Sequence, residues 1–175
     1  MAKIDIDLNP ITHITVDAIG DPGERVFYLQ GRKDDQVITL LIEKIQVQML
    51  VLGFEQFMEE LKQKFPDLTQ ALPDYDEKDM LIFPPLDPLF RVGELSLGYD
   101  TALDLLVLVA HQDESGIEKD EEPGVVRFWC TRSQMLAMAS WAVELAGRGR
   151  PVWPSTGEPI LPGNEFSPKN NGHKH

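Results

Sequence analysis

Val37–Leu50 reads VITLLIEKIQVQML, and Val125–Met138 reads VVRFWCTRSQMLAM. Both stretches follow one plan, in which an apolar strand-like run is followed by a short polar step and an apolar run with helical spacing. The stretches lie 88 positions apart (37 to 125), and three pairs fall in register: Val37/Val125, Lys44/Arg132 and Gln46/Gln134. Such an internal repeat sets the architecture and predicts two halves of similar structure.

The segments around these two stretches complete two βββα units. For the first half, residues 10–65, the alternating and β-branched runs predict strands at 11–19, 26–32 and 37–42 and a helix at about 44–65, ended by Pro66. For the second half, residues 90–147, strands are predicted at 90–98, 105–112 and 125–130, with a helix from Thr131 or Ser133 to about 146. The sequence therefore predicts a single α+β domain over residues 1–175, with two long helices packed on antiparallel sheet.

Two segments outside the halves are rich in proline. The linker, residues 66–89, is also acidic, and we expect it to cross the surface without regular structure. The Pro/Gly-rich tail, residues 148–175, carries four basic and two acidic residues, whereas the chain as a whole is strongly acidic. We predict that this tail closes over the core with Trp153 as its apolar anchor. A disordered C-terminal end is the alternative.

Charge and cysteine content exclude several classes of partner and compartment. The chain of 175 residues has 16 basic and 29 acidic residues, which gives a net charge of −13. This charge argues against binding to nucleic acid or to an anionic membrane surface, because both need clustered Lys and Arg. The single cysteine, Cys130, excludes an internal disulfide and fits a reducing compartment. Because no secretory or membrane-spanning segment is evident, we expect a cytoplasmic protein.

A set of short motifs resembles a known family. The motifs are Gly20-Asp21-Pro22-Gly23, Phe27-Tyr28-Leu29-Gln30-Gly31-Arg32, Glu43-Lys44-Ile45-Gln46, Phe90-Arg91-Val92-Gly93 and Asn171-Gly172. Together they resemble an uncharacterised bacterial family, domain-of-unknown-function family three-zero-nine-zero, over nearly the whole chain. The resemblance implies no established activity.

The tail departs from the pattern of that family. Many members end in a knuckle of the form C-P-x-C-G-x-P, then H-x-C-P, then N-G, whose three thiolates and one imidazole would form a tetrahedral zinc site. The four corresponding positions in this chain are Trp153, Thr156, Glu165 and Ser167. The resemblance therefore implies a degenerate knuckle, and we expect no bound metal.

The sequence carries no catalytic signature, and we expect no catalytic residue and no cofactor. Cys130 and His111 could form a nucleophile and its base, but a buried, inert cysteine is the favoured interpretation. Acidic clusters at 111–122 and 74–79 could hold a hard cation. They lack the spaced ligands and central glycine of a calcium loop, so solvated loops are favoured for both.

The candidate binding site lies on the strand predicted at 26–32. Tyr28, Gln30 and Arg32 alternate along it and therefore share one face. Tyr and Arg are enriched at binding hot spots, so this row predicts a recognition face for an unknown protein partner, although an ordinary solvent face is the alternative. The leading hypothesis is a non-enzymatic protein-binding or regulatory module, with a homo-oligomer possible. The alternative is an enzyme or small-ligand-binding protein with a pocket between the halves that uses Arg32, Tyr28 and His111.

Overall fold

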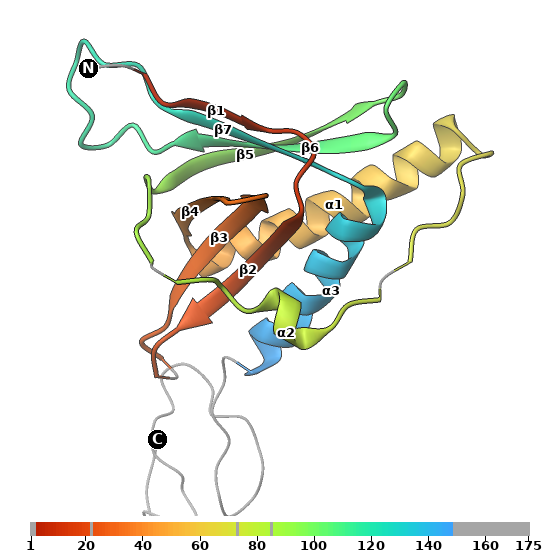
Figure 1. Ribbon diagram of the computed structural model, residues 1–175, viewed down its shortest axis with the longest axis horizontal. Coiled ribbons are helices and arrows are strands. Elements are labelled where there is room, and N and C mark those ends of the chain that lie inside the picture. The colour runs from red at the N-terminus through yellow and green to blue at the C-terminus, as the bar shows by residue number, and fades with distance from the viewer. Residues whose placement is uncertain (1–2, 22, 73, 85, 149–175) are drawn as a thin grey trace, which may run out of the picture.

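The computed structural model describes residues 3–21, 23–72, 74–84 and 86–148, which form two sheets and three helices (Figure 1). In chain order the elements are β1 (Asp5–Leu8), β2 (His13–Ile19), β3 (Val26–Lys33), β4 (Gln36–Ile42), α1 (Lys44–Lys64), α2 (Glu77–Met80), β5 (Val92–Asp100), β6 (Leu105–Gln112), β7 (Val125–Cys130) and α3 (Arg132–Arg148). The predicted α+β class is confirmed. The predictions for the tail concern residues that lie outside the described part of the chain.

The strands divide between a three-stranded and a four-stranded sheet. The three-stranded sheet has the order β2-β3-β4, and the four-stranded sheet has the order β1-β7-β6-β5. Consecutive strands of β2–β4 and of β5–β7 pair antiparallel. Each set of three is followed directly by a long helix, α1 or α3.

β1 corrects the prediction of a purely antiparallel sheet. This strand pairs parallel with β7, from Asp5 opposite Val125 to Leu8 opposite Phe128. Its alternation of Asp with Ile or Leu is a period-two pattern, but four residues carry a weak local signal. The strand forms because β7 offers it an open edge, which the local sequence cannot reveal.

The linker also holds more structure than its composition predicts. The short helix α2 interrupts it, and the Asp76 side chain caps this helix by accepting a hydrogen bond from the backbone N–H of Lys78. Met80 at the end of α2 is buried against β2. Part of the linker, around Met80, therefore packs on the three-stranded sheet.

The main core lies where the two sheets face the long helices. In the view of Figure 1 the four-stranded sheet crosses the top, and α1 and α3 both lie on its lower side. Leu29 and Leu40 from the three-stranded sheet, Leu108 from β6 and Phe54 and Trp141 from the helices are almost fully buried. The sheets approach so closely at Gly31 that a Cβ there would lie 2.4 Å from Cδ1 of Phe128, which explains the glycine. In the described part of the chain, none of the helices has both the length and the apolarity to cross a bilayer.

Candidate functional site

Gln46 fixes the start of α1 against the start of β5. Its side-chain Oε1 accepts a hydrogen bond of 2.8 Å from the backbone N–H of Glu43, which closes a capping box at the first turn of the helix. Its Nε2 donates to the backbone oxygens of Val92, at 3.0 Å, and Gly93, at 3.3 Å. The side-chain amide of Gln46 thus links the first turn of α1 to the start of β5.

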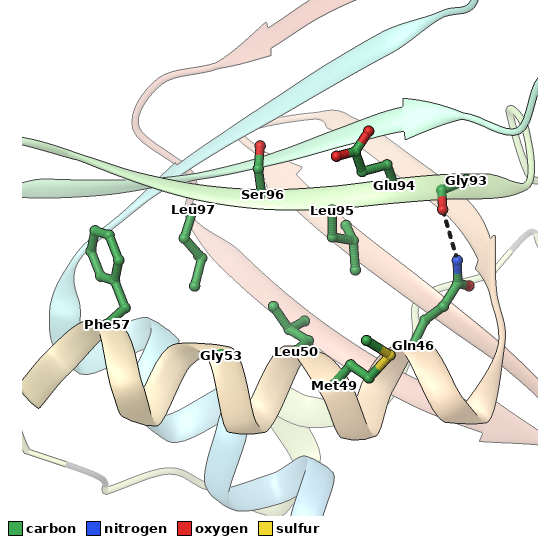
Figure 2. Close-up of a pocket in the computed structure, with 10 residues that line it drawn as sticks. All are labelled: Gln46, Met49, Leu50, Gly53, Phe57, Gly93, Glu94, Leu95, Ser96 and Leu97. Carbon is green, nitrogen blue, oxygen red and sulfur yellow. Dashed lines mark hydrogen bonds between the residues drawn. The ribbon is translucent and has the colours of Figure 1, made fainter.

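Beyond this anchor, α1 and β5 leave a groove of about 450 Å³ between them. Met49, Leu50, Gly53 and Phe57 form the helix wall. On the strand wall, Leu95 and Leu97 point toward the helix, whereas Glu94 and Ser96 point to the other side of the strand (Figure 2). Leu50 is buried at the base of the groove, and Met49 is 63% exposed at its rim. The interior is therefore apolar and accessible.

One side of the groove is the free edge of a sheet. β5 is the last strand of the four-stranded sheet, and within that sheet it pairs with β6 alone. A single bridge from Arg91 to Leu41 precedes the strand on the other side. In the described part of the chain, no strand pairs with the outer edge of β5 from Glu94 to Asp100. Such an edge is a ready template for another extended segment.

The groove contains little that could act in catalysis. Glu94 is its single ionisable lining residue, and its carboxylate points away from the helix (Figure 2). A reaction would need a nucleophile, a base or an electrophilic group within reach of a substrate, and the apolar lining supplies none. The arrangement can instead hold apolar side chains and hydrogen-bond a backbone.

The predicted face of Tyr28, Gln30 and Arg32 has a different role. Gln30 is only 1% exposed. Its Nε2 donates to Oγ1 of Thr39 and to the backbone oxygen of Phe83, and its Oε1 accepts from the backbone N–H of Phe83. Gln30 therefore holds the linker and is unavailable to a partner, which corrects that part of the prediction.

Tyr28 and Arg32 share this covered side of the sheet. The Arg32 guanidinium lies 5.0 Å from the centre of the Phe83 ring, a cation–π contact. Tyr28 is half-buried. Neither residue lines the groove between α1 and β5. The sequence could not reveal this cover because the linker returns to the sheet from more than 50 positions away.

Cys130 and His111 are not brought together. They lie at opposite ends of the β6–β7 pairing, where Cys130 is opposite Leu106 and His111 is opposite Val125. Cys130 is completely buried, and burial raises the pKa of its thiol to about 12. The thiol is therefore protonated at neutral pH and unreactive as a nucleophile.

The acidic loops also lack a metal-binding arrangement. Within the described residues, no group of three or more His, Cys, Asp or Glu side chains could hold a metal ion. Asp113 accepts hydrogen bonds from the backbone N–H and the hydroxyl of Ser115, which hold the pKa of its carboxyl below the ordinary value. The four knuckle positions predicted from 153 to 167 lie outside the described residues.

We did not predict this groove from the sequence, although Gly53 is a signal that could have indicated it. Gly53 lies in the middle of α1, where glycine costs about 1 kcal/mol relative to alanine. A glycine that interrupts a helix between apolar positions often marks a close approach or a site where space is needed. Here it widens the groove opposite Leu97 (Figure 2).

Comparison with known proteins identifies the family of this chain but does not indicate its function. No curated protein and no solved structure matches the chain. The model of one family matches residues 6–166, which is most of the chain. The protein therefore belongs to the family DUF3090, described as "Protein of unknown function".

Proposed function

We propose that this protein is a non-enzymatic, cytoplasmic protein-binding module that holds an extended segment of its partner in the groove between α1 and β5. The observation that carries the proposal is the combination of an unpaired strand edge with an apolar groove beside it. The partner backbone pairs with β5, as in other complexes formed by strand addition. Alternate side chains of the partner then enter the groove between Leu95, Leu97 and α1.

Charge favours a particular kind of partner. The chain carries a net charge of −13, and the single ionisable residue in the groove lining is the acidic Glu94. Lys and Arg beside the apolar anchors of the partner would therefore speed association and disfavour acidic competitors. We propose a segment with alternating apolar residues flanked by basic ones.

Tyr28 and Arg32 remain a second proposed contact surface. Both lie on the face of the three-stranded sheet that the linker partly covers, and Arg32 already stacks on Phe83. A partner could use this surface only together with the exposed ring of Phe83. The double variant Tyr28→Ala with Arg32→Ala tests it, because capture of the partner would weaken without loss of the groove.

We further propose that the two halves are copies of one βββα unit. Three observations support this. The row Val16–Leu29–Leu40 across β2–β4 corresponds to the row Leu97–Leu108–Phe128 across β5–β7. In each half the helix begins two residues after the third strand ends.

The third support comes from Gln134, the counterpart of Gln46. Its Oε1 accepts from the backbone N–H of Thr131 at 2.8 Å, which again closes the first helical turn. Its Nε2 donates to the backbone oxygens of Ile11 and Thr12, just before β2. Each glutamine thus ties its own helix to the first strand of the other half.

Affinity capture from native lysate with matched variants tests the proposed function. Met49→Gln removes an apolar side chain from the rim of the groove, whereas Leu52→Gln changes a side chain of similar exposure (66% against 63%) outside it. A partner should be captured by the wild type and by Leu52→Gln and be lost at least tenfold with Met49→Gln. Equal capture by all three proteins would show that the groove is not the binding site.

A further inference from the structure

A second pocket lies at the end of the three-stranded sheet, where β3 begins, β4 ends and α1 starts. Its volume is about 470 Å³, which falls in the range typical of sites for small organic molecules. It shares no lining residue with the groove between α1 and β5. We call it the Arg25 pocket, after the arginine in its wall.

The Arg25 pocket is basic, although the chain as a whole is acidic. Its ionisable lining residues are three cations, Arg25, Lys44 and Arg91, and one carboxylate, Glu43. Arg91 forms an ion pair with Glu43, so these two charges offset each other. In the described part of the chain, the side chains of Arg25 and Lys44 have no hydrogen-bond or ion-pair partner. Three cations against one carboxylate leave a local charge of +2, in a chain of net charge −13.

Arg25 carries donors that no group of the described chain satisfies. Among the described residues, only three buried side-chain nitrogen or oxygen atoms lack a hydrogen-bond partner, and two of these are Nε and Nη1 of Arg25. An unpaired buried donor is costly, and in a native protein it calls for a specific explanation, such as a bound ion. A guanidinium presents its donors as a planar fork that matches the oxygens of a phosphate or a carboxylate. The pocket wall therefore holds a side chain suited to an oxyanion.

The other walls of the pocket are suited to a carbon skeleton. Val26 and Phe27 at the start of β3, and Leu41 and Ile42 at the end of β4, also line it. Val26 is 44% exposed, so part of this apolar surface is accessible. Apolar residues beside fixed polar groups are the usual arrangement of a site for a small organic ligand. The arrangement favours an anion that carries an organic group over a free inorganic ion.

We propose that the Arg25 pocket binds the phosphate group of a small organic phosphomonoester, with Arg25 and Lys44 as its cationic ligands. A phosphomonoester carries a charge close to −2 at neutral pH, which offsets both free cations, whereas a single carboxylate offsets one. Rotation of the Arg25 side chain turns its unpaired donors toward the phosphate oxygens, and the ammonium of Lys44 donates to them as well. One such pocket is compatible with an acidic chain, because only an extended nucleic acid needs a row of cations. The inference goes beyond the proposed function, since both the site and the ligand differ.

Isothermal titration calorimetry of the full-length protein, in a phosphate-free buffer of low salt, tests this assignment with three probes. They are phenyl phosphate, inorganic phosphate and benzoate. We expect phenyl phosphate to bind at least fivefold more tightly than inorganic phosphate, because the ring contacts the apolar walls. We also expect it to bind at least tenfold more tightly than benzoate, because benzoate carries a single charge. No binding of phenyl phosphate, or equal binding of all three probes, would overturn the proposal.

Variants that remove one cation locate the site. Arg25→Met and Lys44→Gln should each weaken the binding of phenyl phosphate at least fivefold. Lys64→Gln makes the same change of charge at the far end of α1 and should alter the affinity less than twofold. Arg25→Met and Lys44→Gln test the pocket independently, so either one suffices if the other fails to fold. Wild-type affinity in a folded variant of either kind would overturn the assignment of that residue as a ligand.

One further variant should increase the affinity. Glu43→Gln removes the carboxylate that pairs with Arg91, so the phosphate gains a third cation and should bind at least threefold more tightly. Glu60→Gln, on the same helix and outside the pocket, is the matched control and should have little effect. An equal gain in both variants would show that the ligand responds only to net charge and would contradict the site. None of these titrations involves a protein partner, so their failure is distinguishable from failure of the proposed function.

Discussion

Arg132 forms a bidentate ion pair with Asp104 through two hydrogen bonds of 3.0 Å, from Nε to Oδ1 and from Nη2 to Oδ2. The same guanidinium donates to the backbone oxygen and the hydroxyl of Thr69 in the linker. The Tyr99 hydroxyl donates to Asp104 as well. One ion pair thus connects the start of α3, the β5–β6 turn and the linker.

The substitution Asp104→Asn should destabilise the protein in a pH-dependent way. The hydrogen bond from Arg132 holds the pKa of the Asp104 carboxyl below its ordinary value. The carboxylate therefore contributes stability above about pH 4, and this contribution is lost as the pH falls through the lowered pKa. Because the Asp104 side chain is 47% exposed, we expect a loss of only about 1 kcal/mol at pH 7.

Denaturant unfolding of both proteins between pH 3 and pH 7 measures this effect. Asn tolerates the positive φ of 51° at position 104, so the backbone is not a confounding factor. The difference between the two proteins should shrink as the pH falls below 4. A difference that stays constant to pH 3 would mean that the carboxylate charge has no role.

Cys130 should make the protein less stable at high pH. Burial raises the pKa of its thiol to about 12, whereas an unfolded cysteine ionises near pH 8.5. The contribution of the protonated thiol to the free energy of unfolding is therefore fully present below about pH 8.5. Above that pH the free energy of unfolding falls by roughly 1.4 kcal/mol per pH unit, until the pH reaches the raised pKa. Cys130→Ala should lower stability by a constant cavity term and remove this slope.

The measurement is the free energy of unfolding at pH 8 and pH 10.5 for the wild type and for Cys130→Ala. Both proteins contain the same Lys and Tyr residues, so the titration of these residues does not contribute to the difference between the two free energies of unfolding. Parallel curves would show that Cys130 does not titrate differently in the folded and unfolded states.

Gln134 provides a test of how the halves are held together. Gln134→Ala removes both the capping acceptor and the donor to Ile11 and Thr12, so it should cost about 1–2 kcal/mol. Gln134→Glu keeps an acceptor for the Thr131 N–H but has no donor. Chemical denaturation should place the Glu variant between the wild type and the Ala variant. If the Glu variant is as stable as the wild type, the hydrogen bonds to Ile11 and Thr12 before β2 contribute nothing to stability.

The C-terminal segment should not bind zinc. The four positions that would supply ligands in a knuckle hold Trp153, Thr156, Glu165 and Ser167, with no thiolate or imidazole among them. Elemental analysis of the purified, untagged protein should therefore detect no zinc after dialysis. One equivalent of zinc that resists dialysis would refute this prediction.

The sequence predicted those parts of the fold that depend on local pattern. β6 and β7 have the predicted bounds because each is a mostly apolar run between polar loops. β1 could not be predicted because a four-residue strand depends on the distant edge of β7. Both failures in the candidate site have the same origin. The burial of Gln30 depends on where the linker packs, and the opening beside Gly53 depends on how β5 lies against α1. Composition specifies neither arrangement.

Site-specific photocrosslinking in the native host tests the central claim most directly. A benzoylphenylalanine at position 49 lies on the rim of the groove, and one at position 52 lies outside it on the same helix. We predict that position 49 forms adducts with one extended segment of a partner, and that position 52 does not. Adducts of equal yield at both positions, or none at position 49, would contradict the assignment of the α1–β5 groove as the binding site.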